Sequence, residues 1–260
     1  MSGAIDIRGV DFSYPDGRKA LQGVDLGIGA GERVAILGPN GAGKTTLALQ
    51  LNGILQPQAG TITVSGVPVV EDNYREVRRK VGLVFQDAND QLFMPTVRED
   101  VAFGPANFGV AGESLDRRVD AALEVVSGSE FADRPPHHLS GGEKRRASLA
   151  TVLSMEPEVL VFDEPTSGLD PAGRRELIET LASLPMTQLV PEAEDHHVCR
   201  QREARGEAGQ RTRQGVLGLQ REPGVLDAVA VRLRVSHPDC RQRVLHLAAV
   251  VARDAVLLSQ

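Results

Sequence analysis

Short runs of alternating apolar and polar residues fill the first part of the chain. Two such runs cover residues 4–14 and 20–28, with a Pro-Asp-Gly turn at 15–17 between them, and a third covers 60–66. A period of two is typical of strands with one buried face, and Gly and Asp punctuate the runs as they do at turns. This pattern predicts a β-subdomain near the N-terminus.

Two continuous apolar runs, at 34–37 and 159–162, stand apart from this alternation. Each is followed by a loop and a stretch of helical pattern, at 45–55 and 174–184, which is typical of buried parallel strands packed under helices. Residues from about 89 to 155 are mostly helical in pattern and predict an inserted helical subdomain. We therefore expect an α/β fold with a mixed sheet covered on both faces.

Composition narrows the function classes. The chain has 260 residues, 41% of them hydrophobic, and a net charge of −6, which disfavours a nucleic-acid partner. Its first residues lack a signal-peptide pattern, and no apolar run approaches the roughly 18 residues that span a bilayer. With two Cys there is no disulfide framework. We expect a cytosolic chain that reaches a membrane only through a partner.

Residues 38–45, GPNGAGKT, fit the phosphate-loop pattern GxxxxGK(S/T) between a predicted strand and a predicted helix. The glycines let backbone amides curl around a phosphate, Lys44 reaches the β- and γ-phosphates, and the Thr45 hydroxyl binds Mg²⁺. The alternative is a Gly-rich turn that matches by chance. The predicted nucleotide-binding residues are Gly38, Pro39, Asn40, Gly41, Ala42, Gly43, Lys44, Thr45 and Thr46.

The second apolar run ends in Asp163 and Glu164. A buried strand of an open α/β sheet delivers such carboxylates to the edge where ligands bind. Asp163 is predicted to hold Mg²⁺, and Glu164 to polarise the attacking water. The alternative is a solvated turn, which the neighbouring phosphate loop disfavours.

Between these motifs, residues 139–143 read LSGGE. This resembles the signature motif of the ABC ATPases, a family of phosphate-loop proteins. The resemblance implies that Ser140, Gly141 and Gly142 grip the γ-phosphate of ATP bound to a second ABC ATPase subunit, identical or different. It also implies an adenine-stacking role for Tyr14, a Mg²⁺-contacting and catalytic Q-loop role for Gln86, and a D-loop role at the dimer interface for Asp170.

Residues 85–105, FQDANDQLFMPTVREDVAFGP, are similar to the ATPases of energy-coupling-factor importers of cobalt, nickel or vitamins. The resemblance covers residues 1 to about 190. It implies integral membrane subunits as partners and a peripheral place on the cytoplasmic face of the cell membrane. The side chains expected to meet those subunits are Asp87, Asp90, Phe93, Glu99 and Asp100. The residues do not reveal which substrate is transported.

The composition changes near residue 190. Every Lys, Ile and aromatic residue precedes it, whereas both Cys follow it. Residues 191–260 fit either a divergent C-terminal subdomain or foreign sequence from a frame disruption or a chimeric join. The few bulky side chains predict loose order there. The spacings of His196, His197, Cys199, His237 and Cys240 fit no zinc pattern.

The family's switch His, which contacts the γ-phosphate, falls here at Ala193. The alternatives for His196 and His197 are that one of them reaches back about 10 Å to replace it or that both are solvated surface side chains. Hydrolysis is therefore expected to be weak or absent while ATP binding survives. The alternatives to an importer ATPase are a subunit that binds nucleotide without hydrolysing it and a soluble ABC protein outside transport.

Overall fold

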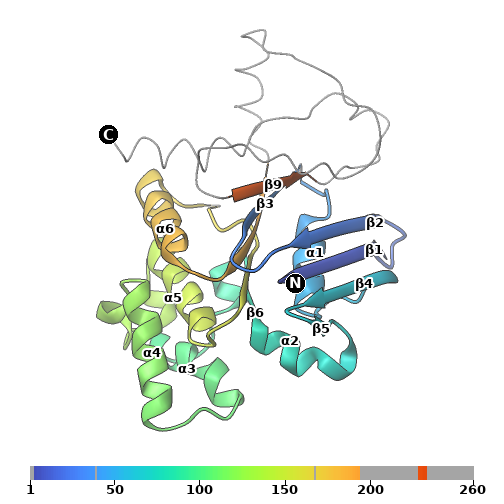
Figure 1. The fold of residues 1–260 in the computed structure, drawn as a ribbon. Helices are drawn as coiled ribbons and strands as arrows, with labels where there is room; N and C mark the ends of the chain where they lie inside the picture. The colour runs from blue at the N-terminus through green and yellow to red at the C-terminus, as the bar shows by residue number, and fades with distance from the viewer. Residues whose placement is uncertain (1–2, 39, 167, 194–227, 233–260) are drawn as a thin grey trace, which may run out of the picture.

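The computed structural model of the chain contains two β-sheets with helices packed around them (Figure 1). It describes residues 3–38, 40–166, 168–193 and 228–232. The mixed α/β fold with one antiparallel and one parallel sheet is the one that the sequence predicts.

The first sheet is antiparallel and forms the N-terminal β-rich layer. Ile5 pairs with Ile28 on one neighbouring strand and with Val64 on the other, so alternate positions face the same side. Ile5 and Ile7 are fully buried there, as the alternating pattern predicts. The strand order is β2 (Lys19–Ile28), β1 (Ile5–Ser13), β4 (Ala59–Val64) and β5 (Val67–Pro68).

The second sheet is parallel and separates two hydrophobic cores. On its strand β7, Val159 and Val161 face one core, whereas Leu160 and Phe162 face the other. Both faces are covered, which explains why this run is continuously apolar. The strand order is β6 (Val81–Val84), β7 (Val159–Phe162), β8 (Thr187–Ala193), β3 (Arg33–Gly38) and β9 (Ala228–Arg232).

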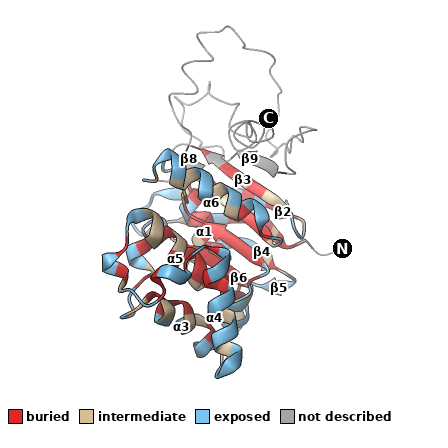
Figure 2. Cartoon of the chain, turned by 90° about the vertical axis from the view of Figure 1, so that its left-hand side faces the viewer, coloured by how far each residue is buried: buried red, intermediate tan, exposed pale blue. Residues whose placement is uncertain are grey.

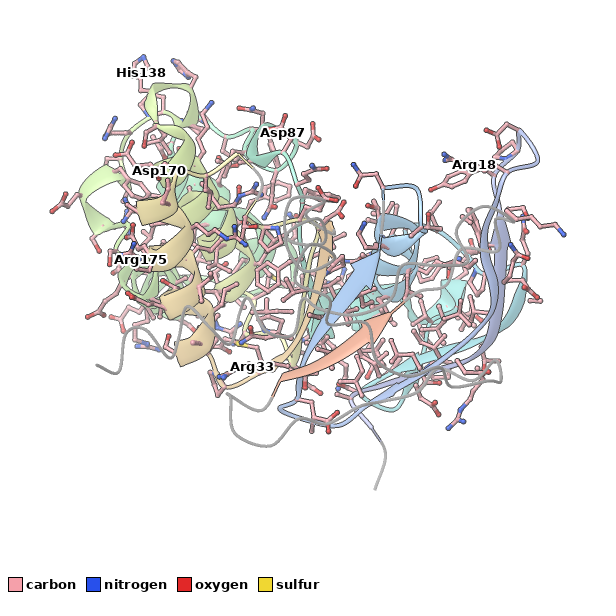
Figure 3. The ribbon with its side chains drawn as sticks, turned by 90° about the horizontal axis from the view of Figure 1, so that it is seen from above. Arg18, Arg33, Asp87, His138, Asp170 and Arg175 are labelled. Atoms are coloured by element: carbon pink, nitrogen blue, oxygen red, sulfur yellow. The ribbon has the colours of Figure 1, made fainter. Side chains whose placement is uncertain are left out.

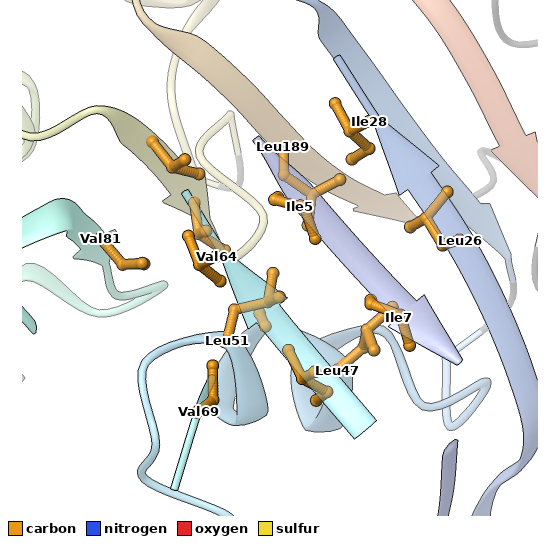
Figure 4. Packing of buried hydrophobic residues seen from close by; sticks show 14 of the residues in the cluster. Ile5, Ile7, Leu26, Ile28, Leu47, Leu51, Val64, Val69, Val81 and Leu189 are labelled. Carbon is orange, nitrogen blue, oxygen red and sulfur yellow. The ribbon is translucent and has the colours of Figure 1, made fainter. Parts of the chain in front are cut away.

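One core lies between the two sheets, around helix α1 (Lys44–Leu51). Leu47 and Leu51 of this helix are fully buried and lie among side chains of both sheets in Figure 4. This packing fixes the start of α1 directly behind the end of β3. A short helix, α2 (Tyr74–Lys80), connects the antiparallel sheet to β6.

The other core joins the parallel sheet to the remaining helices. Figure 2 shows buried positions on their inner faces and exposed positions on their outer faces. A 3-10 turn, η2 (Ala88–Asp90), precedes the first of them, and two more, η3 (Ser129–Phe131) and η4 (Pro136–His138), lie between the second and the third. The helices are α3 (Val97–Asn107), α4 (Glu113–Val125), α5 (Gly141–Leu153) and α6 (Pro171–Ser183).

The C-terminal part departs from the sequence expectation in two places. Strand β8 continues through Pro191 to Ala193, past residue 190, where the composition changes and the expected domain ends. Residues 228–232 form β9 and pair in parallel with β3, although the composition gave no strand signal there. The expected loose order and the dismissed His and Cys metal site concern positions that otherwise lie outside the described residues.

Neither a spanning helix nor a metal cluster is found in the described ranges. None of their helices combines the length and apolarity needed to cross a bilayer. No group of three His, Cys, Asp or Glu side chains in those ranges is placed to hold a metal ion.

Candidate functional site

A cavity of about 310 Å³ lies at the C-terminal ends of β3 and β7. Ligands of open α/β sheets bind at this edge, and the volume is that of a small-molecule site. Residues distant in sequence line it, namely Tyr14, Arg18, Ala20, Asn40, Gly41, Gly43, Lys44, Thr45, Thr46, Gln86 and Glu164.

The phosphate loop joins the end of β3 to the start of α1. Gly43 has φ of 90°, and a Cβ there would lie 2.4 Å from the carbonyl oxygen of Ala20, so only glycine fits. No side chain caps α1, and no acid stands in its first turn. The positive end of the helix dipole is thus available to an anion.

Lys44 is buried beside this helix start, with 4% of its surface exposed. Its Nζ donates a hydrogen bond to the carbonyl of Gly38 at 2.9 Å and lies 3.9 Å from Oε1 of Glu164. A buried ammonium needs nearby acceptors. The positively charged Lys44 side chain therefore lies where the sequence motif predicts a phosphate-binding lysine.

Thr45 and Asp163 meet although 118 residues separate them. The Thr45 hydroxyl donates to Oδ1 of Asp163 at 2.9 Å, and the carboxylate is 8% exposed. Hydroxyl and carboxylate oxygens are the ligands that Mg²⁺ prefers. This pair fits the magnesium role predicted for both residues.

Glu164 is held from two sides. Nε2 of Gln86 donates to its Oε2 at 3.1 Å, and its own backbone N–H donates to the carbonyl of Pro191 at 3.2 Å. Its φ of 48° lies in the left-handed region, which costs a non-Gly residue on the order of 1 kcal/mol. A strained backbone at a residue whose side chain lines the cavity is typical of a functional site.

Tyr14 lies on the opposite wall, anchored to the phosphate loop. Its hydroxyl shares a hydrogen bond of 2.9 Å with that of Thr46, and its ring packs edge-to-face on Phe12. The guanidinium of Arg18 lies 4.8 Å from the centre of the Tyr14 ring. Sequence reasoning missed Arg18 and Ala20, since no motif marks them. The turn at 15–17 was the one signal that Arg18 returns toward Tyr14.

The signature residues do not line the cavity. Ser140 caps α5: its hydroxyl accepts from the N–H of Glu143 at 3.3 Å, and the Glu143 carboxylate accepts from the N–H of Ser140 at 2.7 Å. These bonds from Ser140, with Arg134 nearby, lower the pKa of Glu143 below its ordinary range. Gly141 and Gly142 open the same helix.

Asp170 also lies away from the cavity. Its carboxylate caps α6 by accepting from the N–H of Gly173 at 3.0 Å. Figure 3 shows Asp170 and His138 at the helical end of the molecule, opposite Arg18. Of the predicted nucleotide residues, Ala42 lies buried within the loop, and Pro39 lies outside the described residues.

One of the expected docking side chains is wrongly placed by sequence reasoning. Asp100 is 3% exposed, and its Oδ1 accepts from the N–H groups of Phe93 and Met94 at 3.0 Å each. Burial raises the pKa of this carboxyl, although the two N–H bonds act against that. Asp100 therefore braces the loop that carries Phe93 and does not face a partner. Asp87 and Asp90 remain exposed.

The fold and the site define a nucleotide-binding protein of the phosphate-loop class. The sequence model described as "ABC transporter" matches residues 21–167. The chain belongs to this family and is an ABC ATPase subunit. ABC ATPases use ATP, normally with Mg²⁺.

Relatives place the chain more closely. A Streptomyces coelicolor protein assigned as an ABC transporter ATP-binding protein is 63% identical over 72% of either chain. The energy-coupling factor transporter ATP-binding protein EcfA of Methanothermobacter thermautotrophicus is 49% identical over 75% of this chain and 63% of its own length.

Two solved structures share the fold. The cbiO1 of Clostridium perfringens, described as part of the ABC transporter complex cbiONQ, superimposes with a TM-score of 0.68 at 38% identity. That match covers 75% of this chain and 80% of cbiO1. The ATP-binding cassette MJ0796, in a dimeric post-hydrolysis state bound to ADP and Pi, gives 0.65 at 29% identity over 75% and 90% of the chains.

Proposed function

We propose that this chain is the ATPase subunit of an energy-coupling-factor importer and that it binds Mg-ATP in the cavity described above. One observation carries the proposal. Three separate parts of the chain meet at one sheet edge: the start of α1, the segment after β6 and the end of β7, which carry Lys44, Thr45, Gln86, Asp163 and Glu164. Their chemistry matches a triphosphate, a divalent cation and an attacking water.

The residues divide the work by charge. Lys44 and the start of α1 compensate the phosphate charge, and the oxygens of Thr45 and Asp163 are the ones that would hold Mg²⁺. When bound, the ion neutralises charge on the phosphate oxygens. Glu164 accepts the proton of the attacking water, and Gln86 orients that carboxylate. Tyr14 offers its ring to the adenine.

A second ABC ATPase subunit completes the site in this proposal. Ser140, Gly141 and Gly142 lie at the N-terminus of α5, outside the chain's own cavity. They suit a phosphate presented by another copy or by a different ATPase subunit. The dimeric state of MJ0796 supports this arrangement. Asp170, at the N-terminus of α6, lies on the same side as α5 in Figure 3.

The proposed membrane partner meets the segment after Gln86. Asp87 and Asp90 are exposed there, and Phe93 exposes 63% of its surface. We place the chain on the cytoplasmic face of the membrane, bound to integral subunits that choose cobalt, nickel or a vitamin. The similarity to EcfA and cbiO1 supports this assignment. The nucleotide-binding domain proposed here contains residues 1–190, and the end of β8 and strand β9 add residues beyond 190 to its parallel sheet.

A subunit that binds ATP without turning it over is the second candidate. Ala193 pairs with Gly38 in the parallel register, so the end of β8 lies level with the start of the phosphate loop. The family's imidazole belongs at this position, and an alanine side chain carries no hydrogen-bonding group for a phosphate.

Restoring the imidazole tests both candidates. Purified native chain is expected to bind Mg-ATP and to turn it over slowly, and Ala193→His is expected to raise the hydrolysis rate by about tenfold or more. Ala121→His, at an exposed position of α4, is the matched control and leaves the rate unchanged. A native chain that does not bind Mg-ATP contradicts the proposed function.

A further inference from the structure

The segment that follows β6 is bonded to the signature helix α5 by the side chain of Gln91. Oε1 of Gln91 accepts from the N–H of Phe85 at 3.2 Å. Its Nε2 donates to the carbonyl of Ser148 at 2.8 Å and to the hydroxyl of Thr151 at 2.7 Å. We name these three hydrogen bonds the Gln91 bridge.

The bridge has support on both sides. The guanidinium of Arg145, 6% exposed, donates from Nη1 to the carbonyl of Phe85 at 2.8 Å. Nζ of Lys144 donates to Oδ1 of Asn89 at 2.9 Å. Both backbone polar groups of Phe85 are thus tied to α5, the N–H through Gln91 and the carbonyl through Arg145.

The hydrogen bonds between Phe85 and α5 affect the cavity because of where Phe85 lies in the chain. It immediately precedes Gln86, whose Nε2 donates to Glu164 in the cavity. A shift of α5 therefore carries the peptide of Phe85 with it and changes where the Gln86 side chain starts. Hydrogen bonds from α5 to Phe85, the covalent link from Phe85 to Gln86, and the hydrogen bond from Gln86 to Glu164 thus join the signature helix to the cavity.

The chemistry of the bridge requires an amide. A carboxamide offers one acceptor oxygen and two donors from one nitrogen, and this bridge uses all of them. A carboxylate keeps the acceptor for Phe85 but turns a second acceptor toward the Ser148 carbonyl. An aliphatic side chain of similar size keeps the packing and loses every bond.

We propose that Gln91 is a positioning residue that couples the two ATP sites of the dimer. Phosphate contact at the start of α5 is passed through the Gln91 bridge to Gln86, and so to Glu164 in the chain's own cavity. This inference rests on the proposed function, because it takes the start of α5 to contact the nucleotide of the second subunit.

Two substitutions and one matched control test it on the full chain. Gln91→Leu removes all three hydrogen bonds, and Gln91→Glu removes the two donors. The control is Gln188→Leu: Gln188 is 2% exposed, and its Nε2 donates to the carbonyls of Leu181 and Leu184 at 2.8 and 3.3 Å. Both Gln residues thus bridge a helix through their amides, but Gln188 lies away from residues 85–91.

Hydrogen exchange and Mg-ATP affinity are the readouts. Without nucleotide, Gln91→Leu is expected to speed exchange of the Phe85 amide roughly two- to tenfold, the effect of losing one hydrogen bond. Mg-ATP affinity is expected to stay within about twofold, since Gln91 does not line the cavity. Added Mg-ATP slows exchange in both 85–91 and 140–148 in the native chain and in Gln188→Leu, but in Gln91→Leu only in 140–148 and at Gln86, which lines the cavity itself.

Two results overturn the inference. One is an unchanged exchange rate of the Phe85 amide in nucleotide-free Gln91→Leu. The other is an Mg-ATP response of the Phe85 amide and of 87–91 that survives in Gln91→Leu or is lost equally in Gln188→Leu. If the native chain does not bind Mg-ATP, the proposed function fails, and the nucleotide-free exchange of Phe85 still decides whether the bridge exists.

Discussion

Helices α1 and α5 both begin at a proposed phosphate site, yet their N-termini are built differently. The start of α1 follows Gly43 in a left-handed conformation and has no side-chain cap and no acidic residue in its first turn. The start of α5 has a complete capping box, in which Ser140 and Glu143 satisfy each other's N–H groups. One helix start awaits an anion, whereas the other is stable without one.

This difference suits the two roles. At the chain's own nucleotide site, the N-terminus of α1 has neither a capping side chain nor an acidic residue, so it favours a bound anion such as a phosphate. The signature end keeps its shape alone, so that it can be presented to a second subunit. The Ser140 side chain accepts from the N–H of Glu143 and also hydrogen-bonds the Glu143 carboxylate, whose pKa it lowers.

The largest expected effect comes from a substitution at the start of α1. Lys44→Ala removes a buried cation, so Mg-ATP affinity is expected to fall by on the order of 100-fold or more, with loss of transport. Titration with Mg-ATP measures it. Lys80→Ala is the control, because Lys80 also pairs with a carboxylate, that of Glu158, at the surface. Near-native affinity of Lys44→Ala would refute the phosphate-loop assignment.

The next effect separates binding from chemistry at that same open site. Glu164→Gln keeps the shape of the side chain and loses its charge, so hydrolysis is expected to slow by about 100-fold while Mg-ATP binding persists and a closed dimer accumulates. Single-turnover assays and sizing of the ATP-bound species measure this, with Glu158→Gln as the control. If the native chain already forms a stable ATP-bound dimer without turnover, the substitution changes little.

Removing the cap tests the α5 side. Ser140→Ala is expected to lower the free energy of unfolding by about 1 kcal/mol and to weaken ATP-driven dimerisation, but not ATP binding by the single chain. Thr96→Ala is the matched control, since Thr96 forms the same capping box with Glu99 on α3. Denaturant unfolding and sedimentation are the measurements. Equal losses of dimerisation in both variants would assign Ser140 a capping role alone.

The smallest effect concerns the helical region that carries α5. Because burial raises the pKa of Asp100 above 3.8, the folded chain keeps this proton to a higher pH than the unfolded chain. The contribution of Asp100 to the free energy of unfolding therefore falls as pH rises just above 3.8, opposite to the contributions of Glu143 and Glu158, whose pKa values are lowered. Asp100→Asn keeps an acceptor for Phe93 and Met94 and is expected to flatten that slope. Urea unfolding between pH 4 and 7 measures it, and an unchanged slope would contradict this account.

The sequence predicted most of the strands and helices that lie next to a recognisable motif. The apolar runs at 34–37 and 159–162 form parallel strands, as predicted. Both faces of their sheet are covered, so every position in such a strand is apolar, and this makes the strand recognisable in the sequence. The approach of Thr45 to Asp163 followed from parallel topology, which gathers strand ends at one edge.

Other features had no local signal in the sequence. Asp100 looked like a surface acid, since its burial depends on how the loop at 93–94 folds back over α3. No motif marks Arg18, and the motif at 85–105 contains Gln91 but does not indicate its contacts with α5, which tertiary packing creates. Strand β9 was missed because the residues around it differ so much in composition from the rest of the chain.

Strand β9 changes the status of β3. With β8 on one side and β9 on the other, β3 has no exposed row of backbone N–H and C=O groups. The strand that leads into the phosphate loop is thus enclosed rather than peripheral. Removing residues 228–232 would turn it into an edge strand, and an uncovered apolar edge is a template for pairing with other chains. Residues 228–232 therefore keep β3 from becoming an exposed edge of the sheet.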